Sequence, residues 1–138
     1  MNAPARKQPV IVSMTSFPAA IAYAARAVRS ILEGSVLPDK IVLYLTFSQF
    51  DHPDRQLAEL RALADRNPRF EIRNYDRDIR SYRKLIPALR DFPEAVIVTV
   101  DDDVAYHRHM LRDLLRWHKR LPEVILAHRA RRIIPGKP

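Results

Sequence analysis

Three consecutive carboxylates, Asp101, Asp102 and Asp103, follow directly after an apolar stretch that reads Val96-Ile-Val-Thr-Val100. Five apolar or β-branched residues in a row predict a strand that is buried on both faces and ends where the acids begin. Open α/β sheets bind their ligands at the carboxyl ends of the strands. No Lys or Arg is adjacent to the three acids in the sequence, so their negative charges repel one another. A divalent metal ion that prefers oxygen ligands would neutralise this charge. The pattern therefore predicts an Asp-x-Asp metal site, with a solvated acidic turn that caps the next helix as the alternative.

Three histidines are candidates for further metal ligands. His107 and His109 are two residues apart and do not share a helix face, which favours ordinary surface histidines. His128 lies near the end of a predicted strand, where it is either an added ligand or an ordinary strand-end residue.

The composition excludes several classes of site. With 138 residues the chain is long enough for one domain with a sizeable core. It has no cysteine, which excludes a disulfide framework, a cysteine nucleophile and a thiolate zinc site, and favours a cytoplasmic setting. Gly34 and Gly136 are the only glycines, so neither a Walker loop nor a dinucleotide-binding glycine fingerprint is present. Any bound phosphate must be held by a metal and by side chains.

The net charge points to an anionic partner. Lys and Arg number 24 against 16 Asp and Glu, a formal charge of +8, which suits a phosphorylated small molecule, a membrane surface or a nucleic acid, or simply a basic surface. The cluster Arg129, Arg131 and Arg132 could neutralise a diphosphate or touch acidic lipid headgroups, although a solvated basic tail is the favoured interpretation. Neither a targeting signal nor an apolar run of ~18 residues occurs, so we expect a soluble chain.

Strands and helices are predicted to alternate along the chain. Strands are expected over residues 10–14, 40–46, 70–75, 96–100 and 123–130, and helices over residues 19–33, 54–67, 81–91 and 107–120. Ser16 is expected to cap the first helix, and Pro87 to kink the third or limit it to short pieces. The pattern is typical of an α/β fold with a mostly parallel sheet, helices on both faces and strand order 3-2-1-4. That order would bring residues 15–17 alongside the three acids. The predicted organisation is a flexible arm (1–9), a single domain (10–134) and a tail (135–138).

Four segments carry a family resemblance. They read Val12-Ser-Met-Thr-Ser-Phe-Pro18, then Ser30-Ile-Leu with Pro38-Asp-Lys-Ile-Val-Leu, then Tyr82-Arg-Lys-Leu-Ile-Pro87, and finally Val98-Thr-Val-Asp-Asp-Asp-Val104. In this order they resemble the N-terminal, nucleotide-sugar-binding half of the bacterial GT-A-type glycosyltransferases. The chain ends well before a complete domain of that family would, so the fold looks truncated.

The resemblance implies a Rossmann-like fold that binds a nucleotide-diphosphate sugar through Mn²⁺ or Mg²⁺. It implies that Asp103 coordinates the metal directly. Asp101 would contact the metal through a water molecule or lie nearer the ribose, and Asp102 could exchange roles with Asp101 or Asp103. The other implied contacts with the nucleotide sugar are Thr15, Ser16 and Phe17, which would face the nucleoside, Tyr82, which would stack on the base or pack under the loop, and Arg83 or Lys84, which would reach the nucleotide.

The implied function is a metal-dependent glycosyltransferase of polysaccharide biosynthesis. Its donor would be a UDP- or GDP-sugar and its acceptor a glycan or glycolipid, at the inner face of the membrane if it contacts lipid. The catalytic base is expected to be absent from this chain, and the oligomeric state is open. The alternative is a non-catalytic binding module of the same fold that needs a missing C-terminal half or a partner chain.

Two other functions are less well supported by the residues. A phosphotransfer enzyme of the haloacid dehalogenase type would carry its Asp-x-Asp early in the chain with a Thr or Val two places after it, whereas Ala105 stands there. A nucleic-acid binder is disfavoured because it would rest on charge alone.

Overall fold

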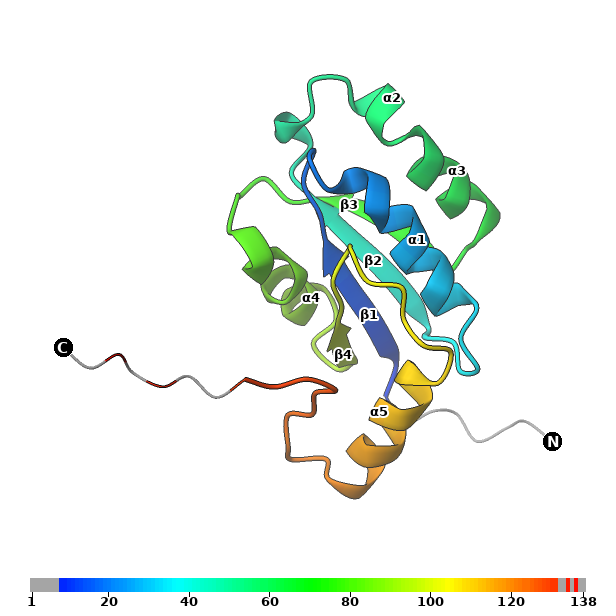
Figure 1. Ribbon diagram of the computed structural model, residues 1–138, viewed down its shortest axis with the longest axis vertical. Helices are drawn as coiled ribbons and strands as arrows, with labels where there is room; N and C mark the ends of the chain where they lie inside the picture. Colours follow the sequence, from blue (N-terminus) through cyan, green and yellow to red (C-terminus); the bar gives the residue numbers. More distant parts are fainter. Residues whose placement is uncertain (1–7, 132–133, 135, 137–138) are drawn as a thin grey trace.

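Four parallel strands form the centre of the structure, in the order β3-β2-β1-β4 that the sequence predicted (Figure 1). The computed structural model describes residues 8–131, 134 and 136. The strands are β1 (Val10–Thr15), β2 (Lys40–Leu45), β3 (Phe70–Asn74) and β4 (Val96–Thr99). Residues of β1 pair with β2 on one side, as Met14 does with Leu43, and with β4 on the other, as Ser13 does with Thr99.

Helices cover both faces of this sheet, as expected. They are α1 (Ile21–Leu32), α2 (Pro53–Gln56), α3 (Ala58–Arg66), α4 (Ile86–Asp91) and α5 (Met110–Arg120), with two 3₁₀ helices, η1 (Phe47–Gln49) and η2 (Arg80–Lys84). Side chains alternate along a strand, so Val12 of β1 joins the core under α1, α3 and α5, while its neighbour Ile11 packs against α4 on the opposite face.

The first helix begins later than predicted, and Ser16 does not cap it. Helix α1 follows Ala20, whose side chain makes no capping bond. The hydroxyl of Ser16 instead donates to the carboxylate of Asp102. A hydrogen bond to an ionised acceptor is roughly twice as strong as one to a neutral group, so the carboxylate competes successfully with the helix end.

Two of the predicted helices are broken into shorter pieces. The helix expected over 54–67 divides into α2 and α3 at Leu57, whose side chain is fully buried. The segment 81–91 forms η2 and then α4, with Pro87 in the first turn of α4, so the prediction that this proline limits the helix is confirmed. Helix α5 begins at Met110, three residues later than expected.

Two predictions about strands are wrong. The segment that precedes the acids was expected to be buried on both faces, but β4 is an edge strand of the described sheet and Thr99 is exposed. Residues 123–130 form turns and irregular backbone rather than a strand. Apolar residues such as Val124 and Ile125 suggested a strand there, but a strand needs a hydrogen-bonded neighbour, and the segment pairs with none of the four strands.

The domain boundaries stay a prediction, because the arm over 1–9 and the tail over 135–138 fall mostly outside the described residues. In the part of the chain that the structure describes, no helix is both long and apolar enough to cross a membrane.

Candidate functional site

The acidic loop, residues 101–103, lies at the carboxyl end of the sheet beside the loop that follows β1. Val100 donates its N–H to the carbonyl oxygen of Ser13 (3.0 Å), which extends the β1–β4 pairing to the edge of the loop. Ser16 Oγ then donates to Asp102 Oδ2 at 2.5 Å, although the two residues are 86 positions apart in the sequence. The juxtaposition expected from strand order 3-2-1-4 is therefore present.

One cation faces the acidic loop directly. Lys84, at the end of η2, places its Nζ 2.5 Å from Asp101 Oδ1. Asp103 is exposed and makes neither a hydrogen bond nor an ion pair with any described residue. Among the described residues, the three negative charges thus meet a single ammonium group, and one carboxylate remains available to a further cation.

Tyr106 anchors this loop to α1, and sequence analysis did not single it out. Its phenol oxygen accepts the backbone N–H of Asp101 (2.7 Å), and its own N–H donates to Ser30 Oγ (2.9 Å) on α1. Burial, reinforced by the charges of the three neighbouring acids, raises the pKa of Tyr106. The phenol therefore stays neutral, and its oxygen fixes the Asp101 backbone. The only signal in the sequence was a tyrosine close to three acids.

Arg83, the residue before Lys84, is buried and tied to oxygen atoms from two strand ends. Its Nε donates to Thr15 Oγ1 (2.7 Å) and its Nη2 to the carbonyl oxygen of Ser16 (2.7 Å). Its Nη1 donates to Thr46 Oγ1 and, at 3.2 Å, to Gln49 Oε1. Thr46 and Gln49 follow β2, and neither was predicted to belong to the site.

The two threonine hydroxyls are oriented by the guanidinium, which has donors only. Each must accept from Arg83, so each turns its own proton toward a backbone carbonyl: Thr15 Oγ1 donates to Tyr44 (2.8 Å) and Thr46 Oγ1 to Tyr75 (2.8 Å). The cluster connects β1, β2 and β3 at their carboxyl ends through a continuous set of hydrogen bonds.

The charge of Arg83 has no carboxylate partner among the described residues, since its contacts are all with neutral oxygens. Only 2% of the residue is exposed, and burial lowers its pKa against the opposing charge of Asp78. Arginine nevertheless remains protonated in proteins. The result is a fixed positive charge beside the acidic loop, which favours an anion at this end of the sheet.

Two aromatic side chains at this end are uncovered. Phe17 is 52% exposed and Tyr82 is 66% exposed, and neither ring contacts another ring among the described residues. The histidines are engaged elsewhere: His109 Nδ1 hydrogen-bonds with Ser35 Oγ (2.8 Å), and His128 Nε2 contacts the carbonyl oxygen of Met110 (3.3 Å).

No preformed cage of three or more acidic, histidine or cysteine ligands occurs among the described residues. The donor chemistry nevertheless fits Mg²⁺ or Mn²⁺. Mg²⁺ commonly takes only one or two protein carboxylates and completes its shell with water and substrate phosphates. Asp103 with Asp101 would supply the carboxylates here.

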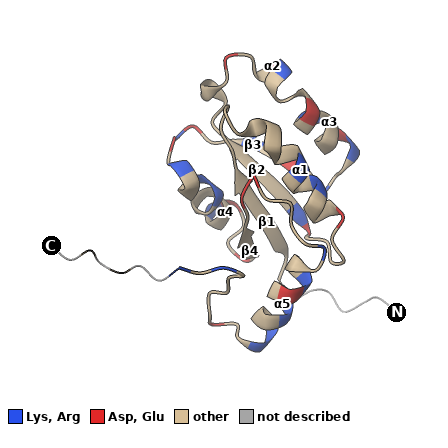
Figure 2. Cartoon of the chain, in the orientation of Figure 1, with Lys and Arg blue, Asp and Glu red and all other residues tan. Residues whose placement is uncertain are grey.

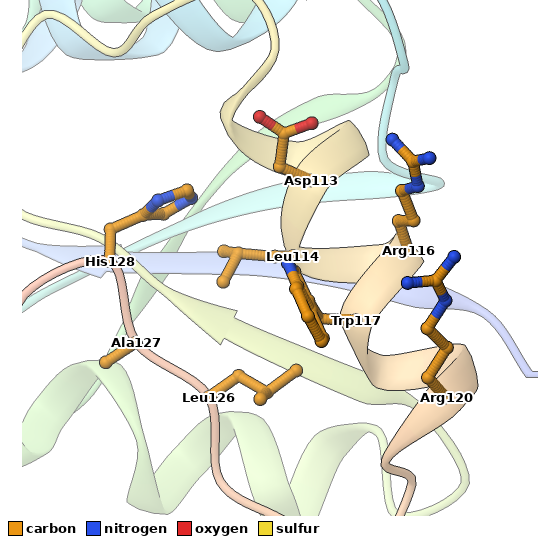
Figure 3. A pocket seen from close by; sticks show the side chains of 8 residues that line it. All are labelled: Asp113, Leu114, Arg116, Trp117, Arg120, Leu126, Ala127 and His128. Atoms are coloured by element: carbon orange, nitrogen blue, oxygen red, sulfur yellow. The ribbon is translucent and has the colours of Figure 1, made fainter.

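A separate hollow of about 710 Å³ lies between α5 and residues 126–128 (Figure 3). Leu126 points from one wall toward Trp117 on the other. None of the residues predicted for the nucleotide site lines this hollow, so it is distinct from the acidic loop.

No family model and no curated protein sequence matches the chain. Solved structures do match, among them the mannosyltransferase PcManGT from Pyrobaculum calidifontis in complex with GDP-Man and Mn²⁺. The TM-score is 0.63 at 18% sequence identity, over 83% of this chain and 33% of that one. This chain shares the fold of a glycosyltransferase. It spans about a third of that neighbour's length, and at this identity the likeness concerns the fold alone.

Proposed function

We propose that the chain forms the donor-binding part of a metal-dependent glycosyltransferase that uses a nucleotide-diphosphate sugar. The observation that carries the proposal is the hydrogen bond from Ser16 to Asp102. It joins the loop after β1 to the acidic loop at the carboxyl end of the parallel sheet. A solved neighbour of the same fold holds GDP-Man and Mn²⁺, which supports a nucleotide sugar and a divalent cation as the ligands.

Asp103 and Asp101 would hold the cation. When bound, a divalent cation offsets the charge of the diphosphate and of the nucleoside diphosphate that leaves the sugar. Asp101 must then exchange the ammonium of Lys84 for the metal. Lys84 would be free to turn to a diphosphate oxygen, since its side chain is long and already lies at the loop.

Arg83 would act as a positioning residue. Its guanidinium donates to protein oxygens, so it holds the loops after β1 and β2 in place. Its buried charge also adds positive electrostatic potential to the proposed nucleotide site. Phe17 and Tyr82 present exposed aromatic faces on which a nucleobase could stack. The acceptor that fits this proposal is a glycan or a glycolipid, as in polysaccharide biosynthesis.

Calorimetric titration of UDP and GDP, with and without Mn²⁺, tests the proposal. Wild type should bind one of the two only when the metal is present, and Asp103→Asn should lose at least about tenfold in affinity, because one good ligand contact is worth about 1.4 kcal/mol or more. Asp65→Asn is the matched control, because Asp65 is exposed on α3 and the substitution removes the same charge as Asp103→Asn. Equal binding by Asp103→Asn, or binding that ignores Mn²⁺, would refute the site.

Lys84→Met gives a second arm in which two ligands respond in opposite directions. Removing the ammonium frees Asp101, so Mn²⁺ alone should bind more tightly, whereas the nucleotide with Mn²⁺ should bind less tightly. If Lys84→Met bound both Mn²⁺ and the nucleotide with unchanged affinity, a role for Lys84 would be contradicted. Tight nucleotide binding without sugar transfer or hydrolysis would identify a donor-binding module rather than a complete enzyme.

A further inference from the structure

The net charge of the chain is concentrated in its last quarter. Residues 104–138 contain nine Lys and Arg against two acids, whereas residues 1–103 contain fifteen against fourteen. Seven of the eight net positive charges therefore follow the acidic loop. Such an asymmetry between parts of one chain indicates an anionic surface as the partner of the basic part.

Helix α5 carries four of these basic residues on its exposed side. Arg112, Arg116, Lys119 and Arg120 are all exposed, and their spacing of four, three and one positions places them on one side of a helix. Figure 2 shows basic positions along the ribbon of α5. Arg112 pairs with Asp113, but the other three form no ion pair with any described residue. The opposite side of the helix, with Met110, packs into the core.

Large apolar side chains are exposed on α5 and in the segment that follows it. Trp117 is 52% exposed, and Val124 and Ile125, in the segment after α5, are 51% and 99% exposed. The guanidinium of Arg120 lies 5.6 Å from the Trp117 ring centroid, so cation and indole share one edge of the helix. Trp117 also borders the hollow between α5 and residues 126–128 (Figure 3).

We propose that this surface, which we call the α5 face and define as Arg116, Lys119, Arg120, Trp117 and Ile125, docks onto an anionic lipid bilayer. Helices that lie in a membrane interface typically combine Lys and Arg with exposed Trp and aliphatic side chains, as this surface does. The cytoplasmic leaflet, where anionic lipids attract polybasic segments, is the matching surface. The proposal goes beyond the donor site and does not depend on it.

The apolar residues distinguish a bilayer from other anionic partners. A nucleic acid would satisfy the arginines but offers no apolar phase for Ile125, which is almost wholly exposed. A second copy of the chain would bring together two stretches of like charge. A lipid surface satisfies both components, because headgroups pair with the cations and the acyl boundary receives the apolar side chains.

Vesicle binding followed through Trp117 tests this directly, because Trp117 is the single tryptophan of the chain. With vesicles of phosphatidylcholine and phosphatidylglycerol, the protein should sediment with lipid and its emission should shift to the blue and be quenched by brominated acyl chains. Pure phosphatidylcholine should give neither effect. Arg116→Gln/Lys119→Gln should weaken binding by at least about tenfold.

Arg26→Gln/Arg55→Gln is the matched control, because both arginines are exposed on α1 and α2 and the variant loses the same charge. This control should bind like wild type, while Ile125→Asp should weaken binding. Failure to sediment, or equal binding by the α5 double variant, overturns the proposal. Binding to tRNA with unchanged Trp117 emission and no lipid binding would assign the face to nucleic acid. A blue shift that grows with protein concentration without lipid would assign it to a second copy.

Discussion

The guanidinium of Arg83 satisfies oxygen atoms from three separate segments: Thr15 and Ser16 at the end of β1, Thr46 directly after β2, and Gln49 in η1. Ser16 and Thr46 are buried, Thr15 and Gln49 are half-buried, and a buried acceptor without a partner costs about 1–3 kcal/mol. A planar fork of five donors can reach all of them from one position, which a lysine ammonium cannot do. The residue therefore contributes to folding as well as to the potential of the site.

Replacing Arg83 by methionine tests that contribution. The variant keeps a long apolar stem but leaves two threonine hydroxyls and a carbonyl without their donor, so we expect the free energy of unfolding to fall by about 2–4 kcal/mol. Urea denaturation measures it, and Arg83→Lys should recover only part of the loss. Arg77→Met is the control and should change little, because Arg77 is exposed and its side chain makes no hydrogen bond with a residue in the described ranges. A loss below about 0.5 kcal/mol in Arg83→Met would contradict the role.

Single residues of the site were only partly predictable from the sequence. A strand followed by three acids located the loop. The expectation that Arg83 or Lys84 reaches the nucleotide stays a prediction, and the structure places Lys84 at the acidic loop. The sequence could not tell that Arg83 points inward while Lys84 points to the acids, because that choice depends on the turn of η2. Thr46 and Gln49 were missed since a polar residue after a strand looks like any other loop residue until a donor is placed beside it.

At the scale of elements, the connection between β4 and α5 needs its own support. Residues 100–109 contain no helix or strand, so their backbone groups must find partners outside a regular element. The phenol oxygen of Tyr106 accepts the N–H of Asp101, and Ser30 Oγ on α1 accepts the N–H of Tyr106. The N–H of Ser35, after α1, donates to the carbonyl oxygen of Arg108 (2.8 Å). The position of the acids is thus determined by α1 as much as by the sheet.

Tyr106→Phe should loosen this connection. The substitution removes the acceptor of the Asp101 N–H while keeping the buried ring, so we expect stability to fall by about 1 kcal/mol and the Asp101 amide to exchange faster with solvent. Amide exchange by nuclear magnetic resonance reports the local effect, and urea denaturation the global one. Tyr23→Phe is the control, because Tyr23 is exposed on α1 and its hydroxyl has no hydrogen-bond partner among the described residues. An unchanged Asp101 amide would show that other contacts hold the loop.

The elements themselves were predicted well where the pattern was long and continuous. The apolar runs of β1, β2 and β4 predicted the sheet, and order 3-2-1-4 was expected if the chain doubles back at the first strand, as it does. The strand expected over 123–130 did not form, because pairing is a tertiary property that an apolar segment alone does not reveal. Ser16 was misassigned for a similar reason: its hydroxyl had a local and a distant acceptor, and only the folded chain decides between them.

For the whole molecule, the two faces of the sheet are supported unequally. Most buried apolar side chains of the described residues belong to the core under α1, α3 and α5, whereas four of them, Ile11, Val42, Tyr44 and Ala88, form the opposite core. That smaller core is completed by a polar contact, in which Tyr44 Oη and Arg73 Nη1 both donate to Asp91 at 2.7 Å. Burial, with further support from Asp91, raises the pKa of Tyr44, so its phenol stays protonated at neutral pH.

This inequality predicts that the α4 side opens before the rest of the molecule. Native-state hydrogen exchange in low urea should give amides of β1 and β2 the full free energy of unfolding, and amides of α4 a smaller one, because little apolar surface is exposed when α4 separates. Tyr44→Phe should lower the opening free energy of α4 by about 1 kcal/mol, since Asp91 loses one of its two donors. Amides of α1, on the other face, serve as the internal reference. If α4 and α1 exchanged with the same free energy in wild type, the chain would unfold as one cooperative unit, and the hydrogen bonds of the Arg83 cluster that join β1 to η2 would then couple the two faces.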